Sequence, residues 1–155
     1  MRLLVISDSH RHYPTLRKII TLHREADRIV FLGDGIDDFD KLDLPFPIAP
    51  VLISGNNDWG SIEPKSETFT VDGVKIFCTH GHLEHVKYGL DLLKIIASEN
   101  DISLVLYGHT HFQSYEYSDG LHLFNPGAVM DGCYGLVDIV NGQIICIKAN
   151  IYDSP

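Results

Sequence analysis

The chain has little that would mark it as secreted, membrane-bound or held together by disulfides. It contains three cysteines, Cys78, Cys133 and Cys146, which is an odd number and shows no CxxC spacing. We therefore expect buried, reduced thiols and a cytoplasmic location. No apolar run approaches the roughly 20 residues that a transmembrane helix needs. The apolar start, residues 1–6, is too short for a secretory signal and lacks a small-residue cleavage site, so we expect no contact with a membrane.

Positive charge is also scarce. The chain has 12 Lys and Arg residues against 21 Asp and Glu residues, for a formal net charge of −9. Surfaces that bind a nucleic-acid backbone broadly are basic, so we do not expect a long nucleic acid as a partner. Bound divalent cations would reverse the sign of the charge locally, because two of them add about +4 at one place. An anionic ligand at such a site therefore stays compatible with the composition.

The remaining composition is that of an ordinary globular protein. The 155 residues are 45% hydrophobic and 21% charged, which suits a folded domain with a substantial core. We find no internal repeat, low-complexity tract or linker. The sequence therefore predicts one domain over residues 1–155.

Five apolar, strand-like runs each stop on a side chain that can bind a metal. The runs and the residues that follow them are 3–6 before Asp8 and His10, 29–32 before Asp34, 51–53 before Asn56, 74–78 before His80, and 104–107 before His109 and His111. Because neighbouring strands deliver their ends to one place, five such stops predict one shared site. The donors are oxygen and imidazole without thiolate, which suits two hard or borderline divalent cations.

The local sequence around these residues suggests how they act. Asp8 and His10 are two residues apart, so in an extended segment both side chains would point to the same side. Asp34 lies between Gly33 and Gly35, which allow a tight turn and a close approach to a ligand. We expect the Asp34 carboxylate, with its two oxygens, to bridge two cations. Asn56 offers an amide oxygen that ligates without adding negative charge.

The first half of the chain reads as a strand–helix–strand unit. We expect strands over 2–7 and 27–32, with a helix between them that Pro14 opens at its first position. A Pro-rich loop, 44–47, precedes a third strand at about 49–54.

The second half reads as hairpins around one helix. Asp72-Gly73 predicts a tight turn between strands over 68–71 and 74–79. A long helix is expected from Val86 to near Asn100, and later turn signals stand at 118–120 and 141–142. These elements predict two sheets packed face to face, with helices outside.

The polar blocks as a set resemble those of the calcineurin-like metallophosphoesterase superfamily. Its blocks are D-x-H, G-D, G-N-x-D, a His beside G-H, and G-H-T-H, and all occur here in that order from Asp8 to His111. Segments 79–82 (Thr-His-Gly-His) and 125–127 (Asn-Pro-Gly) are similar to the small, single-domain YfcE-like phosphodiesterase branch. The resemblance implies an α/β fold, a four-layer α/β/β/α sandwich of two mixed sheets flanked by helices, and metal-dependent hydrolysis of phosphate esters.

The resemblance also implies a dinuclear centre. One ion would be held by Asp8, His10, Asp34 and His111, and the other by Asp34, Asn56, His80 and His109. Two cations about 3.5–4 Å apart lower the pKa of a shared water toward ~7, and the resulting bridging hydroxide attacks phosphorus in line. We expect two ions per chain and manganese as the metal, with nickel, iron, zinc and magnesium as alternatives that such ligands accept.

One departure from the family pattern bears directly on catalysis. Many members carry His directly after the ligand Asn, where it protonates the leaving oxygen, but this chain has Asn57. Asparagine has no proton to give near neutral pH, and Asp58 loses the partner that it usually orients. We therefore expect poor turnover of alkoxide leaving groups, better turnover of activated aryl esters, and diesters as substrates rather than monoesters.

Four further residues are candidates for contact with a substrate or for support of the site. Arg11 is a candidate clamp for a phosphate oxygen, and His12 is a candidate replacement for the missing acid. His82 is expected behind the ligands or facing the substrate, with a purely structural role as the alternative. For Trp59 we favour packing over a wall against a flat leaving group.

The leading functional prediction is a phosphodiesterase that acts on a small phosphoester. One alternative is a protein-binding scaffold without catalysis, because a retromer subunit of the same family works mainly through protein contacts. Another is a nuclease restricted to short nucleotide diesters. The chain is short and has no segment that would serve as a lid over the cleft. A homo-oligomer in which a second copy shapes the cleft is therefore a further hypothesis.

Overall fold

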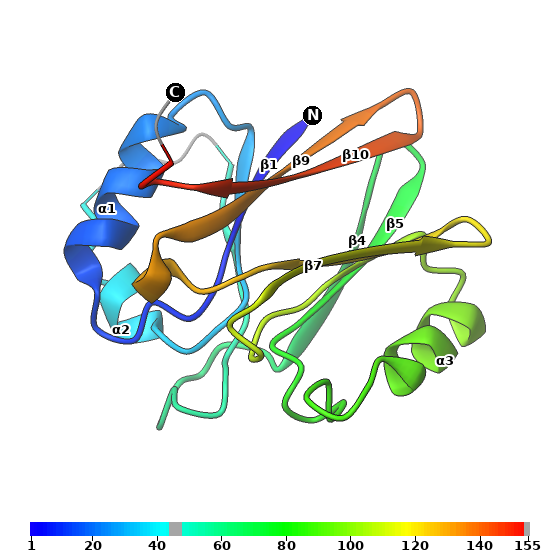
Figure 1. Ribbon diagram of the computed structural model, residues 1–155, viewed down its shortest axis with the longest axis horizontal. Coiled ribbons are helices and arrows are strands. Elements are labelled where there is room, and N and C mark those ends of the chain that lie inside the picture. Colours follow the sequence, from blue (N-terminus) through cyan, green and yellow to red (C-terminus); the bar gives the residue numbers. More distant parts are fainter. Residues whose placement is uncertain (44–47, 154–155) are drawn as a thin grey trace.

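The described residues form two five-stranded sheets packed face to face, with helices on both outer sides (Figure 1). The computed structural model describes residues 1–43 and 48–153, so the Pro-rich segment 44–47, predicted as a loop, lies outside the described residues. The predicted four-layer α/β/β/α sandwich is confirmed.

The first sheet has the strand order β10-β9-β1-β2-β3. Its strands are β1 (Arg2–Ile6), β2 (Arg28–Phe31), β3 (Val51–Leu52), β9 (Cys133–Val140) and β10 (Gln143–Asn150). Strands β1, β2 and β3 run parallel, whereas β9 and β10 are antiparallel to their neighbours. The sheet is therefore mixed, and the three parallel strands all end at the same edge.

The second sheet has the order β4-β5-β6-β8-β7. Its strands are β4 (Ser66–Val71), β5 (Val74–Thr79), β6 (Leu104–Leu106), β7 (Gln113–Ser118) and β8 (Leu121–Pro126). Strands β5, β6 and β8 are parallel, while β4 and β7 are the antiparallel edges. Both sheets thus combine a parallel centre with antiparallel hairpins.

Two longer helices and two short ones complete the described elements. They are α1 (Tyr13–Leu22), α2 (Ile36–Phe39), α3 (Asp91–Glu99) and the 3-10 helix η1 (Val129–Asp131). Pro14 lies in the first turn of α1, where its missing N–H costs no helical hydrogen bond. Helix α1 covers the first sheet and α3 covers the second (Figure 1).

Alternation along the strands explains the layers. In β1, Leu3 and Val5 point into the cluster between the sheets, whereas Leu4 and Ile6 pack toward α1. All four side chains are fully buried. Burying a side chain of this size contributes about 1.5–3 kcal/mol. The strand is therefore apolar on both faces because both of its faces are covered.

The predicted hairpin turns are confirmed in detail. Asp72 and Gly73 have φ values of 46° and 80°, and Asn141 and Gly142 have values of 52° and 77°. Two central residues in the left-handed region define a type I′ turn, whose twist matches that of the flanking strands. The turn at Asp119 has the same form. These short sequence signals determine the strand pairs that close both sheets.

The long helix predicted from Val86 to near Asn100 is wrong at its start. Helix α3 begins at Asp91, and the chain before it forms turns. His85 has a φ of 54° and Gly89 a φ of 145°, so neither residue can belong to a right-handed helix. Val86 is nevertheless buried in the layer under α3, which explains its helix-like spacing. The third strand is also shorter than predicted and covers only Val51–Leu52.

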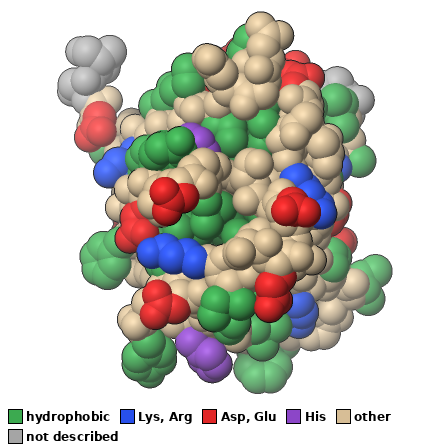
Figure 2. All heavy atoms as spheres, turned by 90° about the vertical axis from the view of Figure 1, so that its right-hand side faces the viewer, with side chains coloured by type: hydrophobic (Ala, Val, Ile, Leu, Met, Phe, Trp, Pro, Cys, Tyr) green, Lys and Arg blue, Asp and Glu red, His purple; other side chains and the backbone are tan. Residues whose placement is uncertain are grey.

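The outer face that carries α3 shows no concentration of positive charge. In Figure 2, Lys and Arg side chains on this face are scattered among Asp and Glu and separated by apolar groups. None of the described helices is long and apolar enough to span a membrane.

Candidate metal centre

The side chains predicted to bind metals follow five parallel strands, β1, β2, β3, β5 and β6, and converge at the junction of the two sheets. Their ligand atoms form two groups, each with all atoms within 4.8 Å of one another. The first group is Asp8, His10 and His111, and the second is Asp34, His80 and His109. Both sheets contribute to both groups, so the centre exists only where the sheets are packed together.

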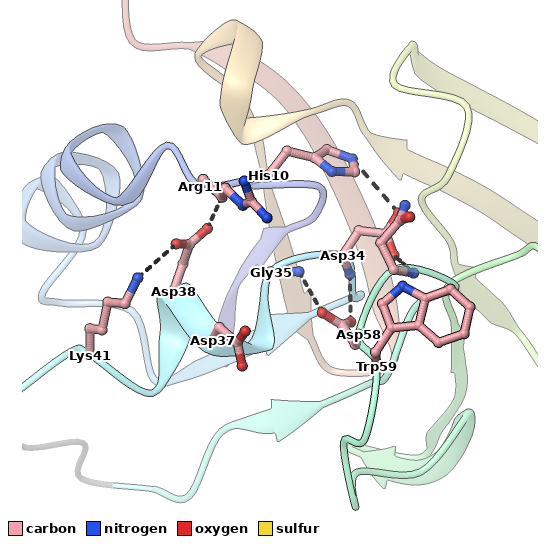
Figure 3. Close-up of a pocket in the computed structure, with 10 residues that line it drawn as sticks. His10, Arg11, Asp34, Gly35, Asp37, Asp38, Lys41, Asp58 and Trp59 are labelled. Carbon is pink, nitrogen blue, oxygen red and sulfur yellow. Dashed lines mark hydrogen bonds and ion pairs between the residues drawn. The ribbon is translucent and has the colours of Figure 1, made fainter.

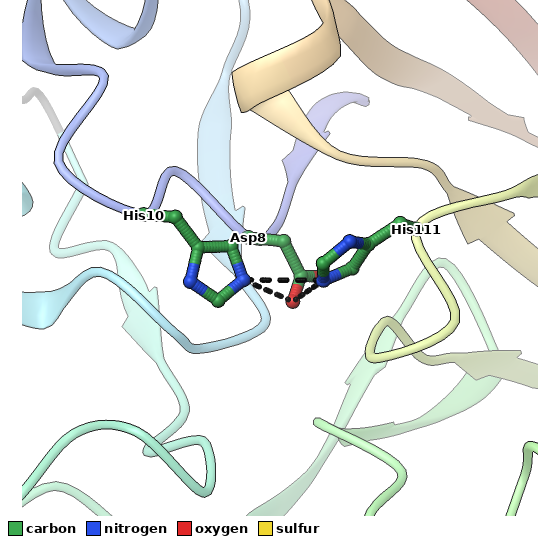
Figure 4. A group of neighbouring side chains, drawn as sticks. All are labelled: Asp8, His10 and His111. Carbon is green, nitrogen blue, oxygen red and sulfur yellow. Dashed lines mark hydrogen bonds and ion pairs between the residues drawn. The ribbon is translucent and has the colours of Figure 1, made fainter.

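The first group leaves one carboxylate oxygen without a hydrogen bond (Figure 4). Asp8 Oδ1 lies 3.4 Å from His10 Nε2 and 3.2 Å from His111 Nε2, and the two nitrogens are 3.1 Å apart. This oxygen is buried and has no hydrogen-bond partner among the described residues. The other oxygen, Oδ2, accepts hydrogen bonds from Ser7 Oγ at 2.6 Å and the His109 N–H at 3.1 Å. Three lone pairs facing one point fit a cation.

The second group is fixed from behind by the backbone. His80 is fully buried, and its Nδ1 donates to the Leu32 carbonyl oxygen at 2.7 Å. That bond leaves Nε2 of the neutral ring directed at Asp34 Oδ2, 3.3 Å away, and at Asn56 Oδ1, 3.0 Å away. A backbone carbonyl that orients an imidazole in this way is a common support of metal-binding histidines.

One oxygen of Asp34 lies between the two groups. Asp34 Oδ2 is 3.3 Å from His80 Nε2 and 3.7 Å from His10 Nε2. Asp8 Oδ1 is also only 3.9 Å from His80 Nε2. The two groups therefore share an edge and form one connected set of donors.

Asn57 holds the Asp34 carboxylate at both oxygens. Its backbone N–H donates to Oδ1 at 2.8 Å, and its side-chain amide donates to Oδ2 at 2.8 Å. The side chain predicted to contact a phosphoryl oxygen therefore contacts the carboxylate of Asp34 in this structure.

Asp58 joins the loops that follow β2 and β3 (Figure 3). Its Oδ2 accepts the backbone N–H groups of Asp34 and Gly55, both at 2.7 Å. Its Oδ1 accepts those of Gly35 at 2.8 Å and Ile36 at 3.0 Å. The sequence suggested a carboxylate that had lost its partner, but Asp58 has four backbone partners instead. Gly55 is required there, because a Cβ would lie 2.1 Å from Asp34 Oδ1.

Most of the predicted ligands have a left-handed backbone. Positive φ values are found at five of them: Asp8 at 56°, His10 at 41°, Asp34 at 60°, His109 at 68° and His111 at 66°. The expectation that Asp8 and His10 lie in an extended segment is therefore wrong, because the chain turns at both. Non-glycine residues in this region cost free energy and occur where surrounding contacts fix the backbone, often at functional sites.

The charges of the metal-free site stabilise one another. Burial opposes ionisation of Asp8, yet the neighbouring imidazoles of His10 and His111 hold its pKa well below the usual range. Burial likewise opposes ionisation of Asp34, but His80 lowers its pKa to about 2. Burial and the neighbouring His80 lower the pKa of His109 to about 4. Both carboxylates are therefore ionised and available to a cation at neutral pH.

The predicted substrate-side residues occupy different places. Arg11 lines a cavity of about 550 Å³ beside His10 and Asp34 (Figure 3). His12 is exposed at the N-cap of α1 and is not among the residues that line this cavity. The His82 ring is half-buried with its centroid 5.4 Å from that of His80, and its Nδ1 has no hydrogen bond among the described residues.

The expectation that Trp59 is a packing residue is wrong. Its side chain is 89% exposed, and it forms part of the wall of the same cavity. Trp59 follows Asp58 directly in the chain. The hydrogen bonds that the Asp58 carboxylate accepts from the backbone therefore also fix Trp59 beside the candidate metal centre.

Sequence reasoning also missed a buried carboxylate that supports the first loop. Asp38 Oδ2 accepts Ser9 Oγ at 2.7 Å and the Arg11 N–H at 2.8 Å. Its side chain lies in the short helix α2, next to the equally acidic Asp37. Two adjacent acids are an ordinary feature of a helical first turn, so the sequence held little signal that one of them is buried.

A comparison with protein families identifies the arrangement. The model of the calcineurin-like phosphoesterase superfamily domain matches residues 1–142. The chain belongs to this superfamily. The resemblance drawn from the motifs is confirmed, and with two ligand groups in place the chain is a metal-dependent phosphoesterase.

Two relatives place this phosphoesterase more closely. The probable metallophosphoesterase YsnB of Bacillus subtilis is 30% identical over 132 residues, which cover 83% of this chain and 75% of the relative. Phosphodiesterase YfcE of Escherichia coli is 26% identical over 168 residues, which cover 89% of this chain and 88% of the relative.

Solved structures show the same fold at lower identity. A conserved protein from Streptococcus pneumoniae, described as a predicted phosphoesterase, superposes with a TM-score of 0.80 at 24% identity, covering 96% of this chain and 88% of that one. Vps29 of Entamoeba histolytica in complex with zinc gives a TM-score of 0.77 at 20% identity, covering 97% and 99%. These likenesses establish the sandwich fold.

Replacing Asp58 tests its part in holding the loops. In Asp58→Asn, an amide NH₂ would face backbone N–H donors, so at least one of them would lose its acceptor. We expect the free energy of unfolding to fall by about 2 kcal/mol, together with weaker metal binding. Chemical denaturation and calorimetric titration with Mn²⁺ measure the two effects. Asp119→Asn, at an exposed hairpin turn, is the matched control, and a loss equal to that of the control would contradict this role.

Metal binding should weaken as the pH falls. The neighbouring Asp8 carboxylate raises the pKa of His10. Burial works against protonation of His80, but the Asp34 carboxylate beside it raises the pKa of this ring overall. Both imidazoles therefore keep their protons to a higher pH than usual, and a cation must displace them. We expect Mn²⁺ to raise the Tm more at about pH 7.5 than at about pH 5.5, on either side of the ordinary histidine pKa. Equal shifts at both values would contradict direct ligation by these histidines.

Proposed function

We propose that this chain is a metal-dependent phosphodiesterase that hydrolyses a small phosphoester. The observation that carries the proposal is the position of Asp34 Oδ2 between the two donor groups, next to an open cavity. The cavity is lined by one member of each group, His10 of the first and Asp34 of the second. The name of the relative YfcE supports a diester rather than a monoester.

In this proposal two divalent ions share Asp34. The first is held by Asp8, His10, Asp34 and His111, and the second by Asp34, Asn56, His80 and His109. When bound, such a pair activates a water molecule for attack on phosphorus and neutralises charge on the phosphoryl oxygens. We propose manganese, although the oxygen and nitrogen donors accept nickel, iron, zinc and magnesium too.

The chain's own residues restrict the ester that can be cleaved. Asn57 offers an amide and no ionisable proton, and Asp58 is engaged by four backbone N–H groups. Asn57, at the sequence position where many family members carry the acid, therefore cannot protonate a leaving group. An activated ester needs no such proton. We retain Arg11, which lines the cavity, as the group that contacts a phosphate oxygen, in preference to the exposed His12.

A protein-binding scaffold is the second candidate. The fold shared with Vps29 supports it, as do exposed aromatic side chains, Tyr88 at 92% and Phe112 at 77% exposure. A scaffold has no physical need for two converging groups of metal donors, however. We therefore prefer the enzyme. A cytoplasmic location is proposed as well, supported by the three free cysteines.

Metal reconstitution with a ligand variant tests the enzyme directly. The metal-stripped protein is loaded with Mn²⁺, Ni²⁺, Mg²⁺ or Zn²⁺ and assayed against aryl mono- and diesters. We expect metal-dependent release of the aryl alcohol, fastest from the diester, and a loss of at least about 100-fold in kcat/KM for Asp34→Asn. Asp119→Asn again serves as the control. Inactivity with every metal would favour the scaffold.

A single substitution tests the missing acid. In Asn57→His the imidazole can donate a proton, so hydrolysis of a diester with an alkyl leaving group should rise by at least about tenfold. Hydrolysis of the matched p-nitrophenyl diester should change little, because p-nitrophenolate leaves unaided. The ratio of the two kcat/KM values is the measured quantity. An unchanged ratio would show that Asn57 does not limit the choice of ester.

A further inference from the structure

The cavity beside the metal centre has an aromatic wall that the fold itself does not need. Trp59 is the single tryptophan of the chain, and 89% of its side chain is exposed. A large apolar side chain gains nothing for stability in such a position. It lies on the wall of a cavity of about 550 Å³, in the size range of small-ligand sites. Figure 3 shows the indole beside Asp58, with Asp34 above Asp58 in this view.

The opposite side of this cavity offers positive charge. The Arg11 guanidinium makes no ion pair or hydrogen bond with any described residue, although its backbone is fixed by Asp38. Lys41 Nζ lies 3.6 Å from Asp38 Oδ1 at the same wall (Figure 3). Asp38 is buried and already accepts two hydrogen bonds, so it competes weakly for the guanidinium. This side is therefore suited to an anion.

A free carboxylate also lines the cavity, in addition to the aromatic and the cationic side chains. Asp37, in the first turn of α2, is exposed and has no hydrogen bond or ion pair with a described residue. It lines both the main cavity and a hollow of about 300 Å³ on the far side of Trp59, which also has Asp40 and Glu63 in its wall. The surroundings of the indole are thus acidic and accept hydrogen bonds. They suit hydroxyl and amino groups and repel a second phosphate.

We propose that the cavity binds the nucleoside arm of a phosphodiester, with its base stacked on Trp59, a sugar hydroxyl on Asp37, and the phosphate toward Arg11 and the metal centre. A nucleoside is the class of arm that combines a flat ring with hydroxyl donors at a short distance from a phosphate. Base–aromatic stacking tolerates every base, so the site selects nucleosides as a class. This inference rests on the proposed phosphodiesterase and names its substrate class.

The single tryptophan makes binding visible without catalysis. Zn²⁺-loaded protein is titrated with adenosine 5′-monophosphate or with ribose 5-phosphate, which carry the same phosphate and sugar and differ in the base. We expect saturable quenching of tryptophan fluorescence by the nucleotide and little change with the sugar phosphate. Equal quenching by both, or by neither, would overturn stacking on Trp59.

Inhibition of diester hydrolysis gives an independent measure. Both compounds are tested as competitive inhibitors of bis(p-nitrophenyl) phosphate cleavage by the Mn²⁺-loaded enzyme. In Trp59→Ala, the preference for the nucleotide over the sugar phosphate should fall about five- to twentyfold, the loss of one stacking contact, and Trp59→Phe should restore most of it. Tyr88→Ala, which removes an aromatic side chain that is 92% exposed and lines neither the cavity nor the hollow beside Trp59, should leave the preference unchanged. A preference unaltered in Trp59→Ala would refute the proposal.

The variant Asp37→Asn tests whether the cavity recognises a nucleoside or only a flat ring attached to a phosphate. This variant should weaken inhibition by adenosine 5′-monophosphate and not inhibition by phenyl phosphate, which has no sugar. Equal losses for both would show that the site selects rings and not nucleosides. If the wild-type protein cleaves no ester with any metal, the phosphodiesterase itself fails, while the fluorescence titration still decides whether the cavity binds a base.

Discussion

The metal centre depends on one interaction, the acceptance of four backbone N–H groups by the Asp58 carboxylate. Those groups belong to the loops after β2 and β3, so a single side chain ties together two neighbouring strand ends of the first sheet. Asn57 then fixes both oxygens of Asp34 from the same loop. Backbone N–H groups are donors that a buried loop must satisfy, and a carboxylate satisfies several at once. The position of Asp34 between the two donor groups follows from this arrangement.

The sequence predicted those parts of the structure that short segments determine by themselves. Asp-Gly and Asn-Gly turns specify hairpins locally, and apolar runs that end on Asp, Asn or His mark the strand ends that meet. The start of α3 could not be read, because Val86 has helix-like spacing but is buried from a turn. The partners of Asp58 and Asp38 are backbone groups of other loops, which no side-chain pattern reveals. The exposure of Trp59 follows only from the path of its loop.

The two sheets supply different kinds of donor side chain to the site. The first sheet supplies both carboxylates together with His10 and Asn56, and the second sheet supplies His80, His109 and His111, so every negative donor comes from one layer and the other layer contributes only imidazoles. Packing of the central apolar cluster brings the layers together and thereby completes the donor set. An acidic chain can hold an anionic ester at this junction because cations and Arg11 reverse the local charge. In the proposed phosphodiesterase, the absence of an ionisable group at Asn57 selects among esters by leaving group.

At the predicted ligands with a left-handed backbone, the stability of the metal-free fold and the binding of metal favour different residues. Glycine at His10 or His111 would relieve the local strain and remove an imidazole in the same step, so mutations that favour the metal-free fold at these positions are losses for the reaction. Selection for thermal stability alone would therefore favour substitutions in these loops that remove metal-binding side chains. Stabilising substitutions in this protein should be sought in the hairpins far from the site and in the helices, where relief of backbone strain does not remove a metal-binding side chain.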